Sequence, residues 1–146
     1  MFGSVLGPRQ QGDLGELSAL AWLTEHGYDV YLPFGHSPDV DMVAWRDGRF
    51  EAVQVKTSRC FIRGRWQLSV ATRGGNQSWN GTVKHFSPDR CDALFALVAD
   101  GRRWFIPATV VEGSCGILLG GPKYAEFEVE PGRPFGADAG LQSLSS

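Results

Sequence analysis

Three polar residues are spaced so that one β-hairpin would bring them together: Asp41, Gln54 and Lys56. Two β-prone runs flank the pair Asp47-Gly48, which is a strong signal for a two-residue hairpin turn. Counting outward from this turn places Asp41 directly opposite Gln54. Because side chains alternate between the faces of a strand, we expect Asp41, Gln54 and Lys56 on one face, within reach of one metal ion and one phosphate group.

A further carboxylate, Glu16, lies on the apolar side of a helix predicted over residues 8–26. At 100° per residue it is close in angle to the apolar stripe of this helix, which consists of Leu17, Leu20 and Leu23. Burial of an isolated carboxylate is costly, so Glu16 needs a partner. We expect it to face Asp41 across the helix–sheet interface with a cation between them, and Gly12 to let the helix approach the sheet closely.

These side chains suit metal-dependent hydrolysis of phosphodiester bonds. Carboxylates such as Glu16 and Asp41 are ligands that Mg²⁺ prefers, and Gln54 can add a neutral carbonyl oxygen. Lys56 can hold or help to deprotonate the attacking water, or stabilise charge in the transition state. Structural alternatives stay open for each residue: a polar strand end for Asp41, a solvated face for Gln54 and Lys56, and an ion pair with an arginine for Glu16.

Charge is segregated along the chain, although the net charge is only −2. Residues 52–88 contain no Asp or Glu, whereas residues 1–51 hold eight acids and three bases. A basic stripe of this kind predicts contact with the phosphates of double-stranded DNA, with a solvated basic loop as the alternative. The candidate DNA-binding residues are Arg59, Arg63, Arg65, Arg73 and Lys84.

The order of predicted elements, one helix followed by a run of strands, indicates an α/β fold with a mixed sheet flanked by helices. The length of 146 residues fits one domain, placed at residues 1–130, and residues 131–146 are predicted to be a disordered tail. Strands are expected at residues 28–32, 40–45, 50–57, 66–71, 93–98, 103–106 and 123–130, and a mobile loop at residues 73–81.

The cysteines and the lengths of the apolar runs indicate the cellular compartment in which the protein is expected. The three cysteines, Cys60, Cys91 and Cys115, form no CxxC pair and no readable disulfide framework, which favours a reducing compartment. No apolar run is long enough for a signal peptide or a membrane span. We therefore expect a cytoplasmic protein with no membrane partner.

Three short motifs resemble the PD-(D/E)XK nuclease superfamily, which has the restriction-endonuclease-like fold. They are GDLGE at residues 12–16, PDVD at residues 38–41 and QVKT at residues 54–57. Within the superfamily, their order and spacing are most similar to the group I intron-associated homing endonucleases of cyanobacterial type. Residues 92–96 and 103–107 are similar to that family's second hairpin, so the resemblance covers about residues 10–110.

The resemblance implies a Mg²⁺-dependent endonuclease that cuts both strands of DNA as a homodimer or homotetramer. It assigns the catalytic set to Glu16, Asp41, Gln54 and Lys56, and the metal ligands to the first three. Gln54 replaces the usual acidic residue, and Asp39 is an alternative to Asp41. The alternative functions are a Holliday-junction resolvase or repair nuclease on the same fold, and a DNA-binding module without catalysis, which the Gln54 replacement keeps open.

Overall fold

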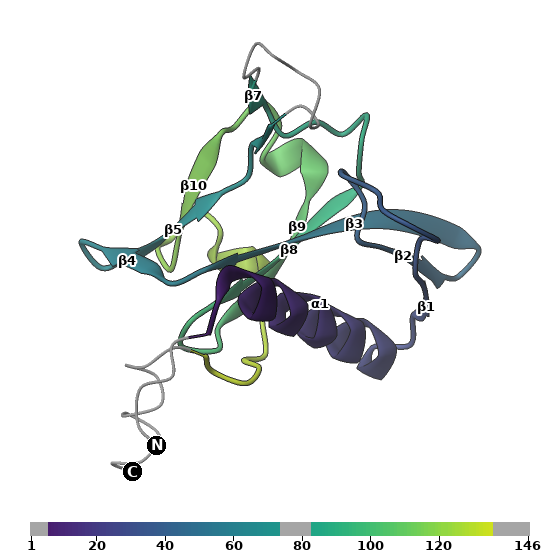
Figure 1. Cartoon of the computed structure of the whole chain (residues 1–146), viewed down its shortest axis with the longest axis horizontal. Coiled ribbons are helices and arrows are strands. Elements are labelled where there is room, and N and C mark those ends of the chain that lie inside the picture. The colour runs from purple at the N-terminus through teal and green to yellow at the C-terminus, as the bar shows by residue number, and fades with distance from the viewer. Residues whose placement is uncertain (1–5, 74–82, 136–146) are drawn as a thin grey trace.

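A six-stranded mixed sheet and one long helix form the frame of the computed structural model, which describes residues 6–73 and 83–135 (Figure 1). The strand order is β1-β2-β3-β8-β9-β11, and β3 and β8 are parallel neighbours while the other pairs are antiparallel. The elements of this frame are α1 (Pro8–Glu25), β1 (Asp29–Tyr31), β2 (Met42–Arg46), β3 (Arg49–Ser58), β8 (Ala93–Val98), β9 (Arg103–Pro107) and β11 (Glu128–Val129).

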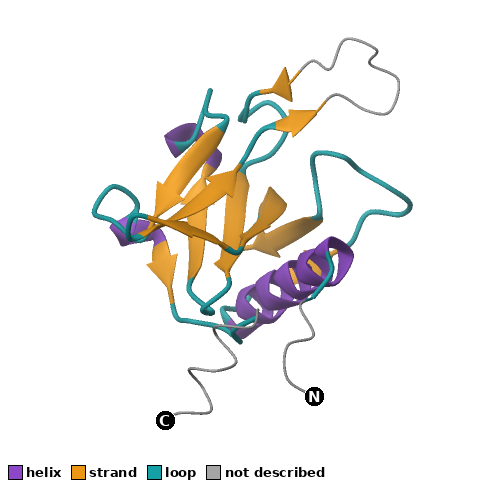
Figure 2. Ribbon diagram, turned by 60° about the vertical axis from the view of Figure 1, so that its left-hand side comes forward, coloured by secondary structure: helices purple, strands orange, loops and turns teal. Residues whose placement is uncertain are grey.

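A second sheet of three strands packs over the face of the main sheet that α1 leaves uncovered (Figure 2). Its order is β10-β5-β4, and a further short pair joins β6 to β7. These elements are β4 (Cys60–Ile62), β5 (Arg65–Ser69), β6 (Thr72–Arg73), β7 (Val83–Lys84) and β10 (Gly116–Leu119), with the 3-10 helices η1 (Ala108–Val110) and η2 (Ala125–Phe127). The sequence pattern predicts β5 but neither β4 nor β10.

The hydrophobic core lies on both faces of the main sheet. On the α1 side, Trp22 and Leu23 pack with Met42, Val53 and Phe95. The opposite side holds a larger cluster that includes Leu68, Leu94, Ala96, Trp104, Ile106 and Leu119. All six residues of β8 are therefore buried, as is typical of a parallel strand covered on both faces.

Helix α1 confirms the predicted helix, but it buries a different face from the one expected. Its buried residues are Gly15, Ala19, Trp22 and Leu23, whereas the side chain of Leu17 is 62 % exposed. Small residues let two elements approach closely, so the helix packs along its Gly15–Ala19 side and Leu17 remains in solvent.

Both predicted hairpins are confirmed. In the first, Arg46 pairs with Arg49 and Trp45 with Phe50, and the turn residues Asp47 and Gly48 have positive φ angles of 54° and 80°. This φ pattern is that of a two-residue hairpin turn. The second hairpin joins β8 to β9.

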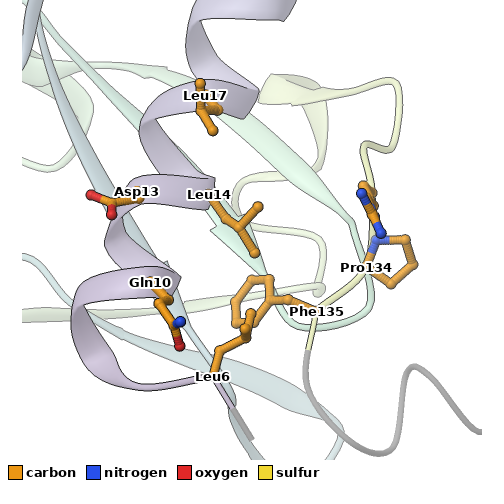
Figure 3. A pocket seen from close by; sticks show the side chains of 8 residues that line it. Leu6, Gln10, Asp13, Leu14, Leu17, Pro134 and Phe135 are labelled. Atoms are coloured by element: carbon orange, nitrogen blue, oxygen red, sulfur yellow. The ribbon is translucent and has the colours of Figure 1, made fainter. Parts of the chain in front are cut away.

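The structure of residues 123–135 differs from the prediction. Residues 123–130 were expected to form one strand, but they contain η2 and only the short strand β11. Residues 131–135 were assigned to a disordered tail, yet Phe135 is buried and its amide donates to the Ala99 carbonyl at 2.8 Å. Figure 3 shows Leu6 and Leu14 pointing toward Phe135, so these residues complete the core beside α1. Residues 136–146, and residues 74–82 of the predicted mobile loop, lie outside the described residues.

Two findings concern the expected compartment. Cys60, Cys91 and Cys115 are all free thiols. Within the described ranges, no helix has the length and apolar character needed to cross a membrane.

Candidate active site

Asp41 lies where the pairing of β2 with β3 stops. The last regular pair is Met42 with Val53, and Asp41 forms a bend just before β2. Its amide donates to the Val53 carbonyl at 2.9 Å, and its Oδ2 accepts the Val55 amide at 2.7 Å. The prediction of a regular Asp41–Gln54 pair is therefore wrong in detail, because the chain bends away. The two hydrogen bonds nevertheless hold Asp41 alongside Gln54.

Glu16 lies next to Asp41, which confirms the expected approach across the helix–sheet interface. Burial, the charge of Asp41 and a hydrogen bond between the two carboxyl groups raise the pKa of Glu16, and Asp13 adds a smaller effect. Neither Glu16 nor Asp41 forms an ion pair with a cation among the residues that the structure describes. Within the described ranges, the two carboxyl groups thus have each other as neighbours and no arginine to balance them.

Gly15, and not Gly12 as expected, permits the close approach of α1 to β3. A Cβ atom at Gly15 would overlap Thr57 Cγ2 and come within 3.1 Å of Val55 Cγ1, whereas one at Gly12 would meet nothing within 4 Å. One turn earlier, Gln11 Nε2 donates to Thr57 Oγ1 at 2.8 Å. The GDLGE and QVKT motifs therefore contact each other through Gly15 and Thr57, a relation that their separation in sequence does not reveal.

Gln54 and Lys56 lie on the face of β3 that points away from α1. Val55 and Thr57 face the helix, so the alternation of side chains places Gln54 and Lys56 on the opposite face. Gln54 is only 5 % exposed, and its carboxamide forms no hydrogen bond with a residue in ranges 6–73 and 83–135. The regular pairing of β3 with β2 ends at Val53, beside Asp41.

A cavity of about 510 Å³ opens at the two carboxyl groups. Its lining consists of Asp13, Glu16, Leu17, Leu20, Leu32, Pro33, Gly35, Asp41 and Met42. No cluster of three His, Cys, Asp or Glu side chains able to hold a metal occurs in the described part of the chain. A metal ion at this site would therefore have two protein carboxylates and complete its coordination with neutral oxygens.

Asp39 lies in different surroundings from Asp41. It does not line the cavity that Asp41 lines. Burial, Asp92, Asp39 and, to a smaller extent, Asp41 raise the pKa of the Cys91 thiol to about 11. Of the two aspartates, Asp41 is the one beside Glu16.

The predicted DNA-binding residues fall into three groups. Arg59 is held by the fold, because its Nε donates to Gln11 Oε1 at 2.7 Å and its Nη2 to the Leu6 carbonyl at 2.8 Å. Arg63 is exposed on the turn between β4 and β5, and Arg65 donates to the Gly64 carbonyl. Figure 1 shows β4 and its turn on the opposite side of the molecule from β1 and β2. The backbones of Arg73 and Lys84 belong to β6 and β7, and the structure does not describe their side chains.

Comparisons with known proteins agree with this arrangement. Residues 6–115 match a family described as PD-(D/E)XK endonuclease. A UPF0102 protein from Trichlorobacter lovleyi is 35 % identical over 99 residues, which cover 64 % of this chain and 78 % of that protein. The structure of a bacterial homing endonuclease, I-Ssp6803I, is similar with a TM-score of 0.72 and 19 % identity, over 96 % of this chain and 95 % of the other. This likeness confirms the predicted restriction-endonuclease-like fold, and the family match shows that the chain belongs to the PD-(D/E)XK endonucleases.

Proposed function

We propose that the protein is a Mg²⁺-dependent endonuclease that hydrolyses phosphodiester bonds in double-stranded DNA. The observation that carries this proposal is the pairing of Glu16 with Asp41 in a cavity, without a neighbouring cation among the described residues. Two adjacent carboxylates repel each other, and a divalent cation removes the repulsion. Family membership supports nuclease chemistry, and the carboxylate pair supports its dependence on a metal.

The residues present fit Mg²⁺. This ion binds hard oxygen ligands, and it is commonly held by one or two carboxylates while it retains several waters. Glu16 and Asp41 would supply the carboxylates. Gln54, a largely buried residue whose carboxamide has no hydrogen-bond partner among the described residues, would supply a neutral oxygen, directly or through water.

When bound, the metal would act as a Lewis acid on the scissile phosphate and make a bound water more acidic. The protein's own part begins with Asp41, whose carboxylate is oriented by the Val55 amide before any substrate arrives. Lys56 follows Gln54 on the same face of β3, and its flexible side chain could bring the ammonium group to the point where the pairing of β3 with β2 ends. There it would hold the attacking water by a hydrogen bond and balance the negative charge that develops on the phosphate.

A single chain offers one such site. Cleavage of both strands at one place therefore requires a second copy, and a homodimer or homotetramer with two-fold symmetry is the proposed assembly. A protein that binds DNA without cutting it is the alternative that the experiment must exclude, because Gln54 leaves the site with one negative charge fewer than an acidic residue would.

The proposal is tested by the conversion of supercoiled plasmid to nicked and linear forms, with Mg²⁺ and with chelator. We expect cleavage only with Mg²⁺, and a loss of about 100-fold or more in single-turnover rate for Asp41→Asn and for Lys56→Ala. DNA binding by Lys56→Ala should persist. Asp39→Asn is the matched control and should cut within a fewfold of the wild type, since Asp39 is not among the acidic groups that raise the pKa of Glu16.

Two results would contradict the proposal. Wild-type cleavage rates for Asp41→Asn would show that the site is misplaced. Binding of DNA by the wild-type protein with no cleavage under any metal would identify a DNA-binding module.

A further inference from the structure

The cavity that holds Glu16 and Asp41 has a largely apolar wall. Leu17 and Leu20 contribute to it from α1, and Leu32 and Pro33 from the segment after β1. Two of these side chains are well exposed, Leu17 at 62 % and Leu32 at 64 %. Phe34, the residue after Pro33, is fully exposed. We call Leu32, Pro33 and Phe34 the apolar rim.

An exposed apolar rim beside polar groups marks a binding surface, because hydrophobic area is removed from water only when a partner covers it. Leu32 and Pro33 line the same cavity as the two carboxyl groups, and Phe34, which follows them in sequence, is exposed outside this lining. A molecule that reacts at Glu16 and Asp41 therefore lies close to Leu32 and Pro33.

The chemistry of the rim is unsuited to the DNA backbone. Phosphates are bound by Arg, Lys, polar groups and backbone amides, and the described lining of the cavity contains no Arg or Lys. The apolar surfaces of DNA are mainly the faces of its bases. In an uninterrupted duplex these faces are stacked on each other, and an aromatic side chain reaches them at low cost where a base has already left the stack, because opening a stacked base step costs a few kcal/mol.

We propose that the apolar rim binds an unstacked nucleobase next to the scissile phosphate, with Phe34 as the stacking partner. The preferred substrate would then be duplex DNA interrupted by an unpaired base, as in a bulge, a gap or a branch point. The cavity, at about 510 Å³, lies within the size range of small-molecule sites and has room for one base. This inference rests on the proposed function for the position of the phosphate.

The test compares the binding of two labelled oligonucleotide duplexes, identical except that one carries a short bulge of unpaired bases. Fluorescence anisotropy is measured in chelator, so that no DNA is cut. We expect the wild-type protein to bind the bulged duplex about tenfold more tightly, and Phe34→Ser to lose most of this preference. Phe34→Trp should retain it. Phe50→Ser is the matched control, because Phe50 is an exposed aromatic at the turn end of the β2–β3 hairpin.

A base analogue whose fluorescence is quenched by stacking, 2-aminopurine, reports the contact directly when it is placed in the bulge. Its quenching by wild type and not by Phe34→Ser is expected. Equal binding of the two duplexes by the wild type, or an equal effect of Phe34→Ser on both, would overturn the inference. If the preference and its dependence on Phe34 hold but no DNA is cut with metal, then the hydrolytic function fails while the base-binding rim stands.

Discussion

At the residue scale, Glu16 reports directly on the state of the site. Burial and the neighbouring Asp41 raise its pKa in the folded protein above the ordinary 4.5. The folded state therefore holds the Glu16 proton more tightly than the unfolded chain does. The stabilising contribution of this proton is fully present below about pH 4.5, and it is lost as the pH rises through the higher, folded pKa. At neutral pH the metal-free protein carries the cost of two adjacent charges.

Glu16→Gln should remove part of this cost. In chelator at neutral pH, the variant should melt at the same temperature as the wild type or a higher one, and its relative advantage should grow as the pH rises from about 4.5. Mg²⁺ should raise the melting temperature of the wild type by mass action and that of the variant much less. Thermal melts over pH and Mg²⁺ concentration measure both effects.

Glu112→Gln, an exposed carboxylate outside the cavity lining, is the control and should leave the response to Mg²⁺ unchanged. A clear drop in the melting temperature of Glu16→Gln in chelator would instead show that Glu16 has a structural partner.

The proximity of Glu16 to Asp41 could be predicted from sequence because two general rules suffice: the angle of a residue on a helix, and the cost of burying a lone carboxylate. The bend at Asp41 could not, because β-prone residues stand on both sides of it, Val40 before and Met42–Trp45 after, so that residues 40–45 are predicted to be one strand. The separation of Gln54 and Lys56 from the helix face was also hidden. It depends on which face of the sheet α1 covers, and that arrangement is set by packing in three dimensions.

At the element scale, the contact between α1 and β3 sets the distance between Glu16 and the strand that carries Gln54 and Lys56. Gly15 has no room for a side chain against Thr57, and Gln11 bonds to the same threonine. Gly15 therefore lets α1 pack more closely on β3 than any other residue at this position would allow. Glu16 is the next residue of the helix.

Gly15→Ala and Gly12→Ala make a matched pair in one helix. Gly15→Ala should force α1 away from β3 and lower the free energy of unfolding by about 1–3 kcal/mol, as overpacking does. It should also weaken the stabilisation by Mg²⁺, because Glu16 moves with the helix. Gly12→Ala should raise the free energy of unfolding by up to about 1 kcal/mol, since alanine favours the helix and meets nothing within 4 Å. Urea unfolding with and without Mg²⁺ measures both changes, and effects of the same sign would show that the close approach is unimportant.

Elements with strong local signals were predictable, and those that depend on distant partners were not. The helix and both hairpins follow from periodicity and from Asp-Gly turns. By contrast, β4 pairs with β5 through the two-residue turn Arg63-Gly64, which lacks the Asn-Gly or Asp-Gly signature of such turns. The partner of β10 is also β5, about fifty residues earlier in the sequence. Residues 131–135 have the composition of a tail, yet Phe135 finds a place in the core that only the assembled fold provides.

At the scale of the whole molecule, the basic residues of the stretch 52–88 have two kinds of role: some hold the fold together and others are exposed on the surface. Arg59 holds the segment before α1 to the end of β3, while Arg63 extends from an exposed turn. The two arginines look equivalent in sequence, but the structure predicts different consequences for their loss.

Arg63→Ala should weaken DNA binding and reduce the slope of log affinity against log salt by about 0.9, the contribution of one phosphate contact, with no change in melting temperature. Arg59→Ala should lower the melting temperature, because Gln11 Oε1 and the Leu6 carbonyl lose a charged donor. Salt titrations of binding and thermal melts separate the two. The assignment is wrong if Arg59→Ala changes only the salt slope, or if Arg63→Ala changes only the melting temperature.

Strand β3 lies between β2, which is close to it in sequence, and β8, which is far along the chain, and this has a consequence for the order of folding. On one edge β3 pairs with β2 through a two-residue turn, so this hairpin can form as soon as its residues are free. On the other edge Gln54 pairs with Leu94, and a parallel partner so far along the chain adds a large loop-closure cost. Glu16, Asp41, Gln54 and Lys56 are all synthesised early, yet the strand that carries two of them stays half paired until β8 arrives. During synthesis on the ribosome, this edge of β3 is thus open to wrong partners until β8 is made.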